Sequence, residues 1–437
     1  MICIIIFPFL FIFINNKKYI SLEFQNYFNE SNENIMKSLF FSNIYYNLTI
    51  GTPKQIIPIL IKFNYYYFSI NNKTSGKTYY FNDHTSNTYI QLSSSRKTEY
   101  YEFVNGYKSE DKFSIENTDY RLNFFCSEIN YYHNIFGGTL GFGLPKNFKE
   151  TDFNLIEYMK KKNYIDDYSV TISYSNKNEG NLLIGSYLHK INKKYKESDF
   201  KSDLTSSAYW SWNVKRVLVG EKLHLYTKYL IHFPELGIII GNKDYYDYIN
   251  KFFENYSNCQ KEIIEIEDDE IKIYPNHDEN KYYYFKCSND FQINQLENIT
   301  FDMNILESKF TLDYQDLFYE YKNSYYFLII FPNFIEENYD EEYNSIILGS
   351  PFYKKYNVTF DMKRKLIGVY KESKYKNKNK QKSNFGTYII LLILIGIIIF
   401  LLYYAFYVKK IFLKKYGFKN IFIEDFEYKT SDYTGLK

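Results

Sequence analysis

The chain has 437 residues, of which 21% are aromatic, with 53 Lys and Arg against 51 Asp and Glu. This length allows two or three domains or one large two-lobed domain. The formal net charge of +2 gives no strong field that would favour nucleic acid or an anionic surface, so we expect no nucleic-acid partner. The 51 Tyr and 40 Phe recur along the whole chain, so a single aromatic residue says little about function.

An apolar stretch opens the chain. Met1 to Ile14 is apolar and is followed by the polar run NNKK at residues 15–18. It has the length of a signal-peptide core, although the basic residues that usually precede such a core are missing. The sequence therefore predicts a signal peptide over residues 1–18 and a short N-terminal extension over residues 19–44.

Short runs rich in Tyr, Ile, Val and Phe follow, broken by Asn, Asp, Gly and Ser. Examples are residues 168–174, 181–185, 212–219 and 327–331. This spacing is typical of mostly β structure. Helical periodicity is rare and is seen at residues 154–161 and 244–253, where apolar residues recur every three to four positions.

Cysteine is sparse. Cys3 lies in the predicted signal peptide, which leaves Cys126, Cys259 and Cys287. In an oxidising compartment Cys259 and Cys287 would close one loop, with Cys126 as a small buried apolar residue. We expect this disulfide; the alternative is three free thiols.

A second apolar segment lies near the C-terminus. Residues 388–408 carry no charged side chain, and about 20 such residues span the hydrocarbon core of a bilayer. The sequence predicts a transmembrane helix here, after a charged stalk at residues 371–386 and before a tail at residues 409–437. Lysines on both sides leave its orientation open. The predicted signal peptide then gives a single-pass type I membrane protein with a lumenal or extracellular ectodomain and a cytosolic tail.

Two kinds of short motif fit this orientation, and both are weak signals in this composition. In the tail, YTGL from Tyr433 to Leu436 has the Tyr-x-x-apolar form that vesicle coat adaptors read. The predicted ectodomain carries Asn-x-Ser/Thr acceptors for N-glycosylation at Asn29, Asn47, Asn72, Asn255, Asn298 and Asn357.

A series of motifs in a fixed order points to one family. They are YNLTIGTP at residues 46–53, FGGTLGFG at 136–143, GNLLIGS at 180–186, YW at 209–210, VG at 219–220, IILGSPFYKKYNVTFD at 346–361 and LIG at 366–368. Each motif alone is an ordinary turn or strand end. In this order they resemble the pepsin-like aspartic proteases, and the composition resembles the plasmepsin branch of that family.

The resemblance implies a mainly β fold of two lobes, at residues 45–200 and 205–370, with a long peptide-binding cleft between them. The matching motifs are structural in this family, so they predict the fold rather than activity. The resemblance implies neither a cofactor nor a metal.

Peptide hydrolysis in this family needs two aspartates that share one proton. Counting without gaps from the Gly-Thr-Pro turn puts Lys62 at the first aspartate, with Phe63 and Asn64 after it in place of Thr or Ser and Gly. An ammonium cannot act as the base. No Asp or Glu occurs between Glu33 and Asp83 to replace it.

The second catalytic position has three possible registers. Counting from the apolar strand before it puts His232 there, and counting back from residues 242–245 puts Phe233 there. A two-residue deletion instead aligns Glu235 with the aspartate and keeps an acid. In every register the hydroxyl groups that steady the carboxylates in this family are lost to Leu, Ile or Phe.

The flap that closes on substrate in this family is altered as well. An ungapped count puts Glu99 at the flap tyrosine, with Tyr100 and Tyr101 adjacent, and the flap glycines are absent. The stretch from Asn15 to Ser42 leaves scarcely any room for the family's inhibitory prosegment, which an inactive protein would not need.

Three functions remain open. We expect a catalytically inactive, membrane-anchored pepsin-fold protein with a binding or scaffolding role, with a peptide or protein as the candidate ligand of its cleft. The alternatives are an active aspartic endopeptidase with an atypical set of acids, such as Glu235 and another carboxylate, and a structural membrane protein whose cleft is filled by its own side chains. A buried Lys62 would need a partner, and Glu235 is the predicted one in the third register; otherwise Lys62 extends into an open cleft.

Overall fold

The structure is a computed structural model of the chain. It describes residues 18–28, 34–72, 79–93, 97–99, 104–129, 136–144, 154–205, 209–221, 223–266, 281–303, 309–333, 344–370, 400–408 and 411. The chain divides into two compact units, Met1–Lys374 and Tyr375–Lys437. The first unit contains every strand and helix discussed below.

Several predicted segments lie wholly or largely outside the described residues. These are the signal peptide, the stalk, most of the transmembrane span, the tail motif from Tyr433 to Leu436 and the acceptor Asn29. Among the residues that are described, no helix combines the length and the apolar character needed to cross a membrane. The membrane anchor therefore remains a prediction.

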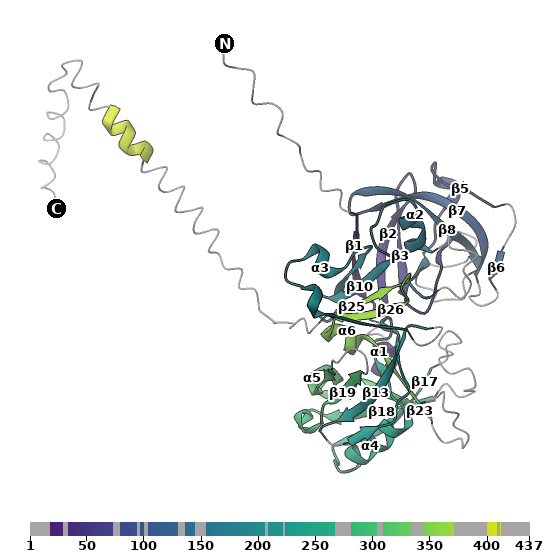
Figure 1. The fold of residues 1–437 in the computed structure, drawn as a ribbon, viewed down its shortest axis with the longest axis vertical. Helices are drawn as coiled ribbons and strands as arrows, with labels where there is room; N and C mark the ends of the chain where they lie inside the picture. The colour runs from purple at the N-terminus through teal and green to yellow at the C-terminus, as the bar shows by residue number, and fades with distance from the viewer. Residues whose placement is uncertain are drawn as a thin grey trace, which may run out of the picture. The chain divides into compact units, whose positions relative to one another are not determined.

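The first unit is mainly β, as predicted, and Figure 1 shows it as two lobes. The first sheet runs in the order β12-β26-β25-β10-β11-β1-β2-β3-β9-β4-β8-β7-β5, with β6 paired to β7. In chain order its strands are β1 (Ile20–Asn26), β2 (Ile44–Ile50), β3 (Gln55–Lys62), β4 (Phe68–Asn71), β5 (Ile90–Gln91), β6 (Lys97–Glu99), β7 (Val104–Ile115), β8 (Thr118–Ile129), β9 (Gly138–Gly141), β10 (Ser169–Tyr174), β11 (Glu179–Ile184), β12 (Phe200–Leu204), β25 (Val358–Asp361) and β26 (Leu366–Tyr370).

The second sheet runs in the order β20-β19-β13-β15-β24-β16-β23-β18-β22-β21, with β14 paired to β13 and β17 to β18. Its strands are β13 (Ser211–Val219), β14 (Leu223–Leu225), β15 (Tyr229–His232), β16 (Ile239–Ile240), β17 (Cys259–Glu265), β18 (Lys281–Ser288), β19 (Ile299–Met303), β20 (Lys309–Leu312), β21 (Phe318–Tyr321), β22 (Ser324–Phe327), β23 (Ile329–Pro332) and β24 (Ser345–Leu348).

Six α-helices accompany the sheets in the described part of the first unit. They are α1 (Ile35–Phe40), α2 (Leu155–Lys161), α3 (Leu188–Ile191), α4 (Lys243–Glu254), α5 (Tyr314–Leu317) and α6 (Ser350–Lys355). The two helices expected from periodicity are confirmed as α2 and α4. Each begins after an asparagine, Asn154 or Asn242, whose side chain accepts hydrogen bonds from the first-turn N–H groups.

Two tight hairpins turn on residue pairs that were not predicted from the sequence. Glu116 and Asn117 connect β7 to β8, and Lys322 and Asn323 connect β21 to β22, with positive φ at all four residues. Two consecutive positive φ values are typical of the two-residue turn that matches strand twist, and Asn tolerates this conformation.

Strands from both ends of the described part of the first unit join the first sheet. β25 and β26 pair with β10 and β12 across Val170↔Phe360 and Ser202↔Gly368, and β1 pairs with β11 and β2. The predicted second lobe at residues 205–370 therefore gives up its last strands to the first sheet. The predicted extension at residues 19–44 likewise contributes a strand rather than standing apart.

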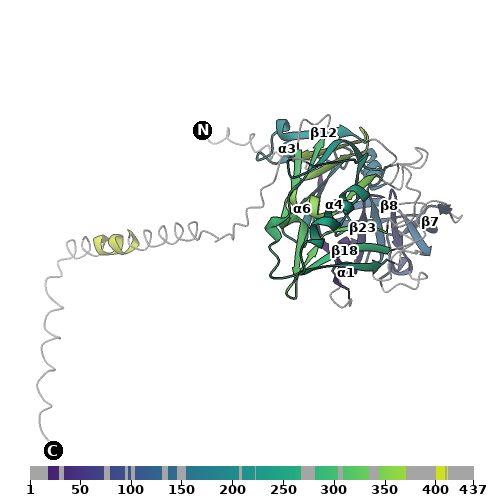
Figure 2. The ribbon, with the colours of Figure 1, turned by 90° about the horizontal axis from the view of Figure 1, so that it is seen from below.

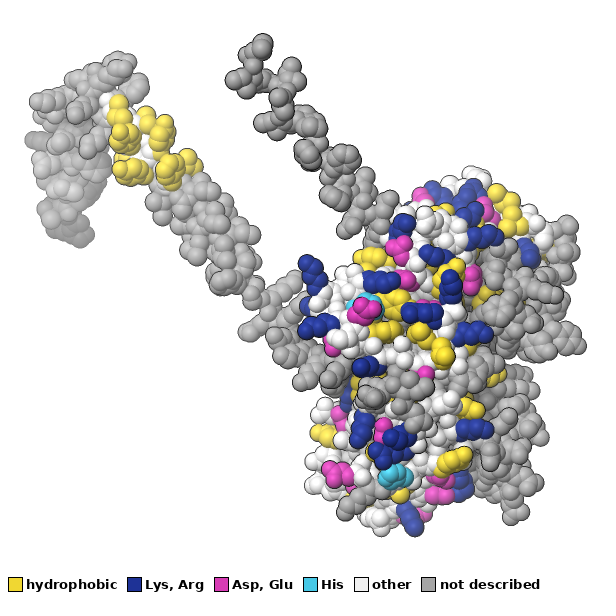
Figure 3. Space-filling model, in the orientation of Figure 1, with side chains coloured by type: hydrophobic (Ala, Val, Ile, Leu, Met, Phe, Trp, Pro, Cys, Tyr) yellow, Lys and Arg dark blue, Asp and Glu magenta, His cyan; other side chains and the backbone are white. Residues whose placement is uncertain are grey.

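The predicted disulfide is confirmed. Cys259 and Cys287 are directly opposite each other in the β17–β18 ladder and are joined by a disulfide bond. Cys126 is a buried free thiol, as expected. Lys and Arg side chains are interspersed with Asp and Glu over the face that Figure 3 shows, in keeping with the small net charge.

Candidate functional site

Two loops follow matching pairs of parallel strands, one pair in each sheet: the first loop is residues 63–67, after β3, and the second loop is residues 233–238, after β15. In the first, β3 pairs with β9 so that Ile61 is opposite Leu140 and Lys62 opposite Gly141. In the second, β15 pairs with β24 so that His232 is opposite Leu348, which precedes Gly349. His232 therefore corresponds to Ile61, and the next residue, Phe233, is the counterpart of Lys62.

Lys62 ends β3 and is 8% exposed. The next side chain, Phe63, packs against Phe142 and Phe360, with ring centroids 5.6 and 4.7 Å away. These aromatic contacts fix the backbone that follows β3. The backbone N–H groups of Phe63 and Asn64 point toward the second loop, where Glu235 accepts hydrogen bonds from them.

Glu235 joins the two loops. Its Oε1 accepts hydrogen bonds from the backbone N–H groups of Phe63, at 3.1 Å, and Asn64, at 3.4 Å. Among the described residues Oε2 has no hydrogen-bond partner, and Glu235 is only 5% exposed. Burial raises the pKa of the Glu235 carboxyl to about 7, although its hydrogen bonds and the charge of Lys62 act to lower it.

The predicted contact between Lys62 and Glu235 takes a different form. Lys62 acts on the Glu235 carboxyl through its charge, but the structure records no ion pair within 4.0 Å between these two described side chains. The carboxylate instead binds backbone N–H groups, which approach from the loop after β3.

His232 is a core residue rather than a group of the loop surface. It is fully buried, its Nδ1 lies 2.7 Å from the Tyr353 hydroxyl, and its ring packs edge-on against Trp212 with centroids 4.3 Å apart. Burial lowers the pKa of His232 to about 3, so the imidazole is neutral at physiological pH. The strand pairing therefore does not support the register in which His232 occupies the second catalytic position.

Phe233 is also covered, at 7% exposure. It belongs to an apolar cluster that includes Leu236 and Ile238 of the second loop and Ile35, Met36, Leu39 and Phe40 of α1. Figure 2 shows α1 beside β18, which contributes Tyr284 to the same cluster. A helix from the predicted extension thus packs on the second loop.

The contact between α1 and the second loop involves backbone on both sides. A Cβ atom placed on Gly237 would lie 1.9 Å from the carbonyl oxygen of Leu39 and 2.7 Å from Cβ of Ser42. Only glycine permits this approach. Sequence reasoning missed α1, although Asn34 followed by IMKSLF carries its capping and apolar signals.

The predicted flap is partly described. β6 and β7 form its hairpin, with Lys97 opposite Gly106 and Glu99 opposite Val104. Tyr100 and Tyr101 lie outside the described residues. Glu99 is the last residue of β6 and the last described residue before β7.

The glycosylation acceptors divide into two groups. Asn47, Asn255 and Asn298 are exposed. Asn72 and Asn357 are only 7% and 3% exposed, and the Asn357 amide donates a hydrogen bond to the Tyr195 hydroxyl. Both of these side chains are buried in the folded protein, and all five described acceptors remain predictions.

The site brings one carboxyl group to the junction of the two loops, next to a buried lysine and opposite a phenylalanine. Sharing of a proton requires two carboxylates in contact. No group of three or more His, Cys, Asp or Glu side chains arranged to hold a metal ion occurs among the described residues. The described geometry thus offers a buried proton-binding group and no partner acid.

The family model described as eukaryotic aspartyl protease matches residues 44–371. No curated protein matches the chain.

Proposed function

Because the chain belongs to the eukaryotic aspartyl protease family, we propose that it is a catalytically inactive member of that family, anchored in a membrane by residues 388–408, with a binding or scaffolding role. The observation that carries this proposal is the strand pairing of the two loops. It makes Lys62 and Phe233 counterparts at the strand ends, where this family places its two aspartates.

The position of α1 supports a version of this proposal in which the cleft is partly filled by the chain itself. The helix buries Leu39 and Phe40 in the cluster that also holds Phe233, and its backbone touches Gly237. A peptide that entered beside the second loop would have to displace α1. Binding would then use the outer surface or the remaining part of the cleft.

One observation favours hydrolysis instead. Burial raises the pKa of Glu235 to about 7, and its Oε2 has no partner within the described part of the chain, which suits a group that takes up and releases a proton. The alternative of an active endopeptidase therefore depends on this residue, and a single substitution separates the two proposals.

We expect the full-length protein in detergent to show no pepstatin-sensitive cleavage of a mixed peptide library between pH 3 and pH 8. A lone carboxyl cannot form the shared-proton pair, so the cleavage rates of the wild type and of Glu235→Gln should be equal within error. Mass spectrometry of the peptides measures the rates. Cleavage that is abolished by Glu235→Gln would establish the active alternative and end the proposal of inactivity.

We further expect the full chain to stay with membranes during alkaline carbonate extraction, and a chain truncated after residue 387 to be released. The apolar span from Tyr388 to Val408 supplies the length that a bilayer core requires. Retention of the truncated chain in the membrane pellet would show that residues 388–408 are not the anchor.

A further inference from the structure

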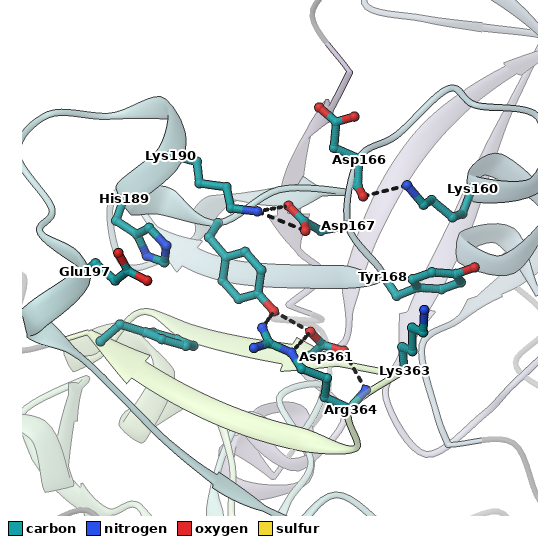
Figure 4. Close-up of a pocket in the computed structure, with 12 residues that line it drawn as sticks. Lys160, Asp166, Asp167, Tyr168, His189, Lys190, Glu197, Asp361, Lys363 and Arg364 are labelled. Atoms are coloured by element: carbon teal, nitrogen blue, oxygen red, sulfur yellow. Dashed lines mark hydrogen bonds and ion pairs between the residues drawn. The ribbon is translucent and has the colours of Figure 1, made fainter.

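A cavity lies away from the two loops, where α2, α3 and the turn between β25 and β26 approach one another. Its volume is about 550 Å³, within the range of about 300–1,000 Å³ typical of small-molecule sites. Figure 4 shows charged side chains around it and aromatic rings among them. No step of the proposed function uses this cavity.

Much of the charge around the cavity is neutralised within the protein. Lys190 binds Asp167 at 2.7 Å, and Arg364 binds Asp361 at 2.8 Å while also donating to the Tyr187 hydroxyl. Asp361 is 4% exposed and Tyr187 is 3% exposed. The charges at the centre of the cavity are therefore paired with one another. The charged groups at its two ends are the ones available to bind a ligand.

One end of the cavity carries two lysines, Lys160 and Lys363, with the exposed Asp166 carboxylate beside Lys160, 3.9 Å from Lys18. Lys160 donates to the backbone carbonyl of Asp166 at 2.7 Å, and Lys363 lies over the Tyr168 ring, 5.4 Å from its centroid. Within the described part of the chain, the structure records no ion pair for either lysine. The nearby guanidinium of Arg364 is 55% exposed and carries N–H groups beyond the two used for Asp361 and Tyr187.

The other end carries a carboxylate beside aromatic rings. Glu197 is exposed, and the structure records no ion pair for it among the described residues. His189 stacks on Tyr187 with centroids 5.3 Å apart, and Phe200 lies next to both. Burial lowers the pKa of His189, so at neutral pH the imidazole adds no positive charge beside Glu197.

Figure 4 shows Lys160 and Lys363 at one side of the cavity and Glu197 with His189 at the other. We propose that this cavity binds a small zwitterion, with a phosphate at the lysine end and a substituted ammonium at the Glu197 end. Phosphocholine and phosphoethanolamine have this chemistry, either free or as the headgroup of a lipid. Lysine and arginine are suited to phosphate oxygens, and aromatic rings beside a carboxylate are suited to ammonium groups.

The position of the cavity in the chain makes a lipid headgroup a reasonable source. The Tyr370 hydroxyl lies 2.8 Å from Nδ1 of His189 at the cavity, and Tyr370 ends β26, the last strand before the predicted stalk. This part of the inference rests on the proposed membrane anchor. The proposal that the cavity binds a zwitterion does not rest on the anchor, because it follows from the charges of Lys160, Lys363 and Glu197.

The test is calorimetric titration of the full-length protein in maltoside micelles, which contain neither phosphate nor ammonium. The probes are phosphocholine, phosphoethanolamine and inorganic phosphate, together with a short-chain phosphatidylcholine added to the micelles. The variants are Lys160→Gln with Lys363→Gln, and Glu197→Gln. Matched controls are Lys251→Gln and Glu221→Gln, which change exposed charges outside the cavity.

We expect saturable binding of at least one of the two zwitterions, weakened at least tenfold by the paired lysine changes and by Glu197→Gln, and unchanged in the controls. Binding of the short-chain phosphatidylcholine with the same dependence would identify the lipid as the source, and binding of the free headgroup alone would identify a soluble ligand. Absence of saturable binding, or binding of inorganic phosphate as tight as that of the zwitterions and indifferent to Glu197, would overturn the proposal. Neither result bears on peptide cleavage, so the proposed inactivity is judged separately.

Discussion

The wild type is expected to lose about 3 kcal/mol of its free energy of unfolding as the pH rises from 4.5 to above 7. Replacing Glu235 with glutamine is expected to abolish this loss. Burial raises the pKa of this carboxyl from 4.5 in the unfolded chain to about 7 in the folded protein. Between these values the folded state binds more protons than the unfolded state. The free energy of unfolding therefore falls with rising pH, and glutamine, which does not titrate, cannot show this slope.

The measurement is chemical denaturation of the full chain at pH 4.5, 6 and 8. At pH 8 the Glu235→Gln variant should be the more stable protein, and at pH 4.5 the two should agree, because the side-chain carbonyl still accepts the N–H groups of Phe63 and Asn64. Glu197→Gln, at an exposed carboxyl, serves as the control. A wild-type slope that survives in Glu235→Gln would contradict the assignment.

Replacing Gly237 with alanine is expected to separate α1 from the second loop and to cost about 3 kcal/mol of stability. The new methyl group would sit 1.9 Å from the carbonyl oxygen of Leu39, which is backbone and cannot turn aside as a side chain would. Hydrogen exchange of the amides of α1 should rise steeply, since the helix is short and is stabilised mainly by its packing.

The control for this prediction is Gly143→Ala, at which the nearest backbone atoms are 2.9 Å from the added methyl group. It should be the milder change and should leave exchange in α1 as it is in the wild type. Equal exchange rates of the α1 amides in the wild type and in Gly237→Ala would mean that the helix does not depend on this contact.

Much of the fold could be predicted from the order of its motifs and from local pattern. The Asn-capped helices α2 and α4 have clear periodicity. The disulfide between Cys259 and Cys287 could be predicted because so few cysteines leave few possible pairings. The return of β25 and β26 to the first sheet was not visible. Strand pairing over such a sequence distance leaves no periodic signal in either strand.

The site was predicted less completely. Lys62 was located because the Gly-Thr-Pro turn fixes the count to it. The second loop stayed ambiguous because His232, Phe233 and Glu235 lie close together and each fits one alignment. The parallel pairing of β15 with β24 makes Phe233 the counterpart of Lys62. No sequence pattern indicates that Oε1 of Glu235 accepts hydrogen bonds from two backbone N–H groups of the loop after β3.

The pairing of β25 and β26 with strands of the first sheet has a consequence for biosynthesis. The first sheet holds β10 and β12 but also needs β25 and β26, the last strands of the first unit to be made. At roughly 5–20 residues per second, translation leaves this sheet with an open edge for about tens of seconds. We therefore expect the nascent chain to require a chaperone that covers exposed strand edges, and the first lobe to stay sensitive to proteases until residue 370 has emerged.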